Sequence, residues 1–75
     1  MSRHGPRLPA RVTLPSAPMM PAWHVRDALG ASKQVLHLWR VRSGFPSFIR
    51  DGRDYLTSTD AIADWLRAKG VEVVR

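Results

Sequence analysis

The sequence of 75 residues contains no cysteine. This absence excludes disulfide bonds and zinc sites built on thiolates, and nothing else in the composition indicates an oxidising compartment. Long hydrophobic runs are also missing. The longest uncharged stretch, residues 12–23, is interrupted by three prolines and is too short to cross a hydrocarbon layer of about 30 Å. We therefore expect an unprocessed, soluble, cytosolic protein without a membrane partner.

Acidic residues are half as frequent as basic ones. Six Asp and Glu stand against twelve Lys and Arg, which gives a formal net charge of +6. This excess favours a polyanionic partner, because each contact between a cation and a phosphate releases condensed counterions. A basic surface without such a partner is the alternative interpretation. A chain this short also provides only one small core, so we expect a single domain.

Catalytic and metal-binding patterns are absent as well. The histidines His4, His24 and His37 lie in separate segments, and no cysteine or close acidic group completes a metal site. The sequence has no nucleophile–base set and no glycine-rich phosphate loop. Turn and helix-dipole chemistry accounts for Asp51 and Asp60. We therefore expect a protein that is not an enzyme and that uses no cofactor or metal.

The N-terminal segment is rich in proline. Residues 1–21 hold five of the six prolines and almost no regular apolar spacing, and they include three arginines: Arg3, Arg7 and Arg11. This composition predicts a disordered basic arm over residues 1–20. The folded domain is then expected at residues 21–70. Residues 71–75 form a short apolar tail that is a strand, an interface or a frayed end.

Two helices are predicted at the start of this domain. The first begins near Pro21, whose fixed φ suits a first helical turn, and ends at Gly30. The second spans residues 33–42, with Ser32 as its N-cap. Its inward face carries two residues spaced by three, Leu36 and Trp39. Two short helices joined by a turn around Gly30 predict a helix-turn-helix.

The hydrophobic period changes after Pro46. Two β-prone runs within residues 47–57 flank Asp51-Gly52, a dipeptide typical of hairpin turns. Thr57, Ser58 and Thr59 then offer N-caps, and Thr57 with Asp60 resembles a capping box. A third helix follows and ends at Gly70. The predicted fold class is mainly α with a small β-hairpin: a winged helix-turn-helix of three helices plus the wing.

The three tryptophans allow two interpretations. They can be stacking platforms for single-stranded nucleic acid. The sequence favours a core position for Trp39 and Trp65, because both fall in phase with aliphatic neighbours. Trp23 is expected to be a half-buried lid on the first helix.

The second helix is the element expected to enter the major groove of DNA, which is about 12 Å wide. Lys33, Gln34 and His37 are predicted to contact bases, and Arg40 or Arg42 to hold phosphates. Arginines at the tip of the wing extend the phosphate contacts. The complete predicted DNA-binding set is Ser32, Lys33, Gln34, His37, Arg40, Arg42, Arg50 and Arg53.

Several separated landmarks within residues 20–69 resemble the AlpA/excisionase-type regulators of phages and mobile elements. They are the run Leu29-Gly30-Ala31-Ser32-Lys33, Trp39, Gly44-Phe45-Pro46, the arginine-containing hairpin and Trp65-Leu66. Leu38 and Arg40 depart from the family pattern. The resemblance implies a MerR-like winged helix-turn-helix of the bacterial cytoplasm or nucleoid, phage-encoded, that regulates transcription or directs excision. An integrase or RNA polymerase would be its protein partner.

Other functions stay open at this point. The small terminase subunits of tailed phages open with a similar module that recognises DNA-packaging sites. A protein-interaction adaptor on the same fold is a further alternative. For a DNA-binding module we expect a homodimer or a cooperative array, because one such module buries only about 600–1,000 Å² on DNA.

Overall fold

A computed structural model describes residues 8–75, which form three helices and five strands. In chain order the elements are β1 (Arg11–Thr13), β2 (Met19–Pro21), α1 (Ala22–Leu29), α2 (Lys33–Arg42), β3 (Ile49–Asp51), β4 (Asp54–Ser58), α3 (Thr59–Ala68) and β5 (Glu72–Val74). Helices take 41% and strands 25% of the described chain. The prediction of a mainly α winged helix-turn-helix is therefore wrong, and the fold is a mix of helix and sheet.

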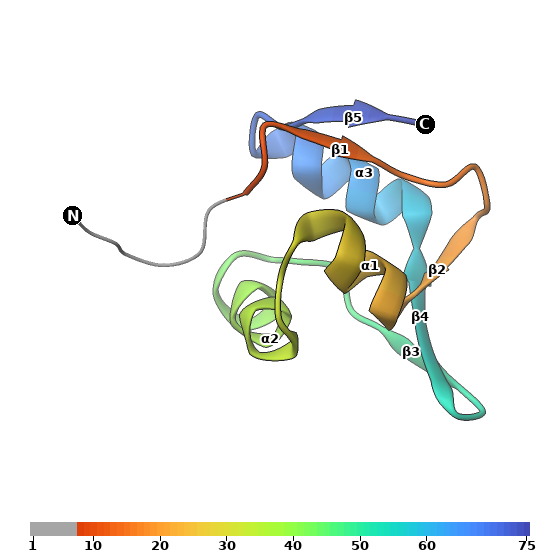
Figure 1. Ribbon diagram of the computed structural model, residues 1–75. Helices are drawn as coiled ribbons and strands as arrows, with labels where there is room; N and C mark the ends of the chain where they lie inside the picture. The colour runs from red at the N-terminus through yellow and green to blue at the C-terminus, as the bar shows by residue number, and fades with distance from the viewer. Residues whose placement is uncertain (1–7) are drawn as a thin grey trace.

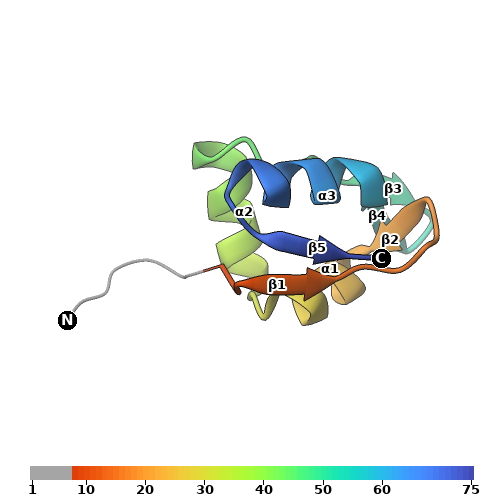
Figure 2. The same ribbon diagram turned by 90° about the horizontal axis from the view of Figure 1, so that it is seen from above.

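The strands that were not predicted lie towards the two ends of the chain. β1 and β5 form a parallel two-stranded sheet in which Arg11 is paired with Glu72, and both views show these strands side by side (Figures 1 and 2). Val12 and Leu14 are buried, whereas Arg11 and Thr13 are exposed. This alternation has the period of a strand with one face on the core.

The expected disordered arm does not hold for residues 8–20. Pro15 and Pro18 lie in the loop between β1 and β2, where the missing proline N–H breaks no strand pairing. Residues 71–75, for which three roles were open, supply β5. The remaining arm residues, Arg3, His4 and Arg7, lie outside the described residues.

The second sheet has the strand order β2-β4-β3 and is antiparallel. Met20 is paired with Thr57, and Asp51 with Asp54. The turn of the predicted hairpin is therefore Gly52–Arg53, one residue later than the expected Asp51-Gly52. Gly52 has φ 63°, and in the described chain only glycines have a positive φ. Glycine at the first turn position is typical of a type II′ hairpin.

The helices begin and end close to the predicted residues, for local reasons. The Ser32 hydroxyl accepts a hydrogen bond from the Val35 N–H at 3.2 Å and caps α2. Among the candidate caps for α3, Ser58 takes this role and accepts from the Ala61 N–H at 3.2 Å. Within residues 8–75, no helix has the length and apolar character of a membrane span.

An aromatic cluster joins α2 to α3. The rings of Phe45 and Trp65 meet edge to face at 4.7 Å, and those of Trp39 and Trp65 lie 5.6 Å apart. Trp39 and Trp65 are buried, as predicted. Trp23 is 60% exposed and stacks on His24, so the prediction of a half-buried lid is wrong. The cluster supports α2 from one side only and leaves its opposite side to solvent.

Candidate nucleic-acid interface

A groove of about 290 Å³ lies between α1, α2 and the β3–β4 hairpin. Three cationic side chains line it: Arg26 from α1, and Lys33 and Arg40 from α2. The apolar and aromatic side chains of its lining are Ala22, Leu36, Phe48 and Tyr55. The described residues that line this groove include no carboxylate. A groove with this lining attracts anions and has apolar surface between its charges.

The periodicity of α2 places two of its three basic residues on the groove, together with His37. Lys33, His37 and Arg40 are separated by four and three positions, so they follow one stripe of the helix. Leu36 and Trp39 occupy the buried side. The helix contains no acidic residue along its ten positions. Its accessible surface therefore carries positive charge that no acidic residue of the helix offsets.

A second hollow of about 250 Å³ continues the groove towards the hairpin tip. Arg26, Lys33 and Tyr55 line both hollows, and Arg53 and Trp23 join them in the second. Asp54 is the acidic residue in the lining of this second hollow. The basic surface thus extends from α2 past α1 to the turn of the hairpin.

The hairpin arginines are exposed. Arg53 lies in the turn itself. Arg50 stands opposite Tyr55 in the β3–β4 pairing, and its Nε donates a hydrogen bond to the Gly52 carbonyl oxygen at 3.1 Å. This bond uses one guanidinium N–H and leaves the others directed to solvent or a ligand.

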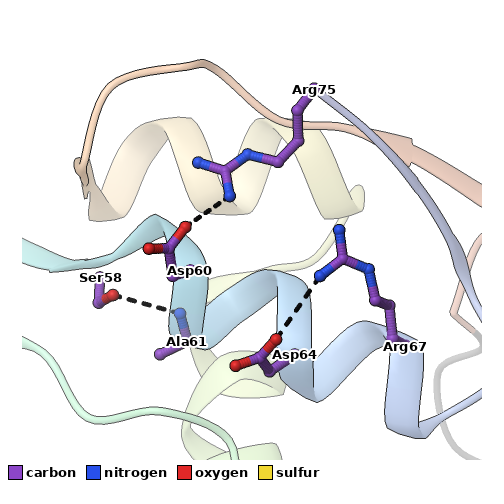
Figure 3. Close-up of polar contacts among 6 residues, drawn as sticks. All are labelled: Ser58, Asp60, Ala61, Asp64, Arg67 and Arg75. Carbon is purple, nitrogen blue, oxygen red and sulfur yellow. Dashed lines mark hydrogen bonds and ion pairs between the residues drawn. The ribbon is translucent and has the colours of Figure 1, made fainter.

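The ion pairs lie away from the groove. In residues 8–75 they join Asp60 to Arg75, Asp64 to Arg67 at 3.5 Å and Glu72 to Arg11 at 3.1 Å, all on α3 or the β1–β5 sheet (Figure 3 shows the first two). In Figure 1 this sheet lies at the top, whereas α2 and the hairpin tip lie at the opposite end. Three of the six acidic side chains are therefore neutralised away from the groove, whereas Asp27, Asp51 and Asp54 form no ion pair in the described residues.

Within residues 22–75, the net positive charge belongs to the part of the chain that contains α1, α2 and most of the β3–β4 hairpin. Residues 58–75 contain three basic and three acidic side chains and are neutral overall. Residues 22–57 contain six basic and three acidic side chains, a net charge of +3. None of these six forms an ion pair within the described chain: Arg26, Lys33, Arg40, Arg42, Arg50 and Arg53.

The predicted site residues do not all lie in the groove. Lys33, His37 and Arg40 come together in the groove, whereas Gln34 and Arg42 lie on other exposed positions of α2. Ser32 is occupied as a helix cap. Sequence reasoning missed Arg26 and Tyr55. Arg26 lies off the apolar stripe of α1, which was a usable signal, but only the packing of α1 beside α2 brings it to the groove.

Comparisons with protein-family models, characterised proteins and solved structures find no match to this chain. In the described residues, no three His, Asp or Glu side chains are placed together to hold a metal ion. The function must therefore be inferred from the geometry and charge of the groove and of α2.

Proposed function

We propose that this protein binds double-stranded DNA through α2, the adjoining groove and the β3–β4 hairpin. The observation that carries the proposal is the row of unpaired cations along the groove: Arg26, Lys33, Arg40 and, at the hairpin turn, Arg53. Cations without carboxylate partners keep their full attraction for an external polyanion. Duplex DNA supplies phosphates in regular rows along both of its strands.

The exposure of α2 supports a duplex rather than a single strand. A helix of ten residues is about 15 Å long, and the major groove of B-DNA is about 12 Å wide and admits one helix. Trp39 and Trp65 are buried in the core and offer no face to unstacked bases, and of the exposed rings at the second hollow, Trp23 and Tyr55, the first is stacked on His24. Arg50 and Arg53 then contact the backbone beside the groove that α2 occupies.

The role of such binding in the cell is a separate step. The proposed role as a transcriptional regulator or an excisionase of phage origin rests on the sequence resemblance alone. An integrase or RNA polymerase would then be the expected partner. Binding as a homodimer or cooperative array stays part of the proposal, because one small module gives little contact area.

Fluorescence anisotropy with a labelled duplex of random sequence, over a series of salt concentrations, tests the proposal. We expect the logarithm of the binding constant to fall linearly with the logarithm of salt, by about 0.9 per phosphate contact. Arg40→Ala should weaken binding and reduce this slope by about one. Arg67→Ala, on the neutral side and paired with Asp64, is the matched control and should change neither.

Three outcomes would overturn the proposal. The first is absence of duplex binding at low salt. The second is binding with equal affinity at all salt concentrations, and the third is an equal loss of affinity in Arg40→Ala and Arg67→Ala. A salt-insensitive complex with a protein would instead favour the adaptor function.

A further inference from the structure

The outward side of α2 carries a second stripe that the groove does not use. Gln34, Leu38 and Val41 are separated by four and three positions, so they lie along one line of the helix. Leu38 is 41% exposed and Val41 66% exposed. The core does not account for these aliphatic side chains, because Leu36 and Trp39 form the buried side of the same helix.

Cations border this stripe on both sides. With 3.6 residues per turn, His37 lies next to the stripe on one side, with Lys33 and Arg40 beyond it, and Arg42 lies on the other side; the helix has no acidic residue. A polyanion bound by both flanks covers the stripe between them. The occupant must therefore combine rows of negative charge with apolar groups that reach Leu38 and Val41.

The major groove of DNA meets both conditions at A·T base pairs. The C5-methyl group of thymine is the apolar substituent that bases expose there, and it packs against aliphatic side chains. Adenine presents N6 and N7, which pair with the amide of glutamine in two hydrogen bonds. We infer that α2 recognises A·T base pairs, with Leu38 and Val41 against thymine methyl groups and Gln34 on an adenine edge. This inference rests on the proposed DNA binding and names the sequence class that is bound.

A second copy of the chain fits the stripe less well. Stable protein interfaces bury more than about 1,000 Å² with good complementarity. Two aliphatic side chains with cations on either side offer only a small part of that area, and a second copy would bring its own cations against them. The charge around the stripe thus favours a nucleic acid.

The test uses three labelled duplexes of equal length: alternating A·T, the same duplex with uracil in place of thymine, and alternating G·C. Uracil keeps the hydrogen-bonding groups and removes only the methyl group. We expect the tightest binding to the thymine duplex. For each thymine methyl group that packs against α2, the uracil duplex should have a dissociation constant about fourfold higher. The G·C duplex should bind more weakly than either.

Variants connect this preference to the stripe. Leu38→Ala/Val41→Ala should bind the thymine and uracil duplexes equally, at about the affinity that the unsubstituted protein has for uracil. Val74→Ala, a valine in β5 that is also partly exposed, is the matched control and should keep the full preference for thymine. Circular dichroism verifies that each variant is folded.

Each outcome distinguishes the inference from the proposed function. Salt-dependent binding with equal affinity for thymine and uracil overturns the inference and leaves DNA binding in place. A preference that persists in Leu38→Ala/Val41→Ala also overturns it. Self-association that disappears in this variant, measured by analytical ultracentrifugation, would assign the stripe to a second copy. Absence of binding to all three duplexes overturns both proposals.

Discussion

The indole Nε1 of Trp65 donates a hydrogen bond of 2.8 Å to the carbonyl oxygen of Ser43, the residue that follows α2. This bond connects the middle of α3 to the end of α2. It also provides a partner for a backbone carbonyl that the helix leaves unpaired. Together with the packing of Trp65 against Trp39, it holds the helix on which the proposed interface is built.

Replacing Trp65 with phenylalanine should therefore destabilise the fold. The variant keeps an aromatic ring but has no donor and fills less of the buried volume, and we expect a decrease of about 2 kcal/mol in the free energy of unfolding. Urea denaturation followed by circular dichroism measures it. Trp23→Phe is the matched control and should change stability by less than about 0.5 kcal/mol, because Trp23 is exposed. Equal decreases would show that the bond to Ser43 is unimportant.

Replacing either of two nearby threonines with valine should change the stability of the protein, in opposite directions for the two positions. Thr59 is fully buried and its hydroxyl has no hydrogen-bond partner in the described structure, so Thr59→Val should raise stability by about 1 kcal/mol. The Thr57 hydroxyl donates to the Ser47 carbonyl oxygen at 3.1 Å. Thr57→Val should lower stability by about 1 kcal/mol. Thermal or urea unfolding compares the two variants directly, and lower stability in Thr59→Val would contradict the assignment.

The N-terminal strand should behave as part of the core. Leu14 is buried and its N–H donates to the Val74 carbonyl oxygen at 2.8 Å. Leu14→Ala is expected to lower the free energy of unfolding by about 3 kcal/mol, because less apolar surface is buried and a cavity remains. Leu38→Ala, the same change on the exposed side of α2, should lower it by less than about 0.5 kcal/mol. A small effect at Leu14 would instead support the disordered arm expected from composition.

Substitution of Ser32 should change the stability of the protein more than its affinity for DNA. Its hydroxyl caps α2, so Ser32→Ala should lower stability by about 1 kcal/mol, whereas Ser32→Asn retains a capping side chain and most of that stability. Anisotropy under conditions in which all three proteins are folded should give similar DNA affinities. Much weaker binding by a stable Ser32→Asn protein would show direct contact of Ser32 with DNA.

The sequence by itself determined the features that depend on neighbours three or four positions away. Ser32 as a cap, the bounds of α2 and the buried positions of Trp39 and Trp65 follow from helical spacing and capping chemistry. The hairpin was also predictable in outline. Its exact turn was not, because both Asp51-Gly52 and Gly52-Arg53 satisfy the local requirement for glycine.

Only the tertiary structure decided the β1–β5 sheet and the composition of the groove. The pairing of Arg11 with Glu72 joins residues 61 positions apart, and three-residue strands among prolines give no local signal of it. Their stability comes from burial of Val12 and Leu14 against distant elements. In the same way, Arg26 and Tyr55 reach Lys33 only because α1, α2 and the hairpin pack together. Short-range propensity determined the helices, and long-range burial determined where their charges meet.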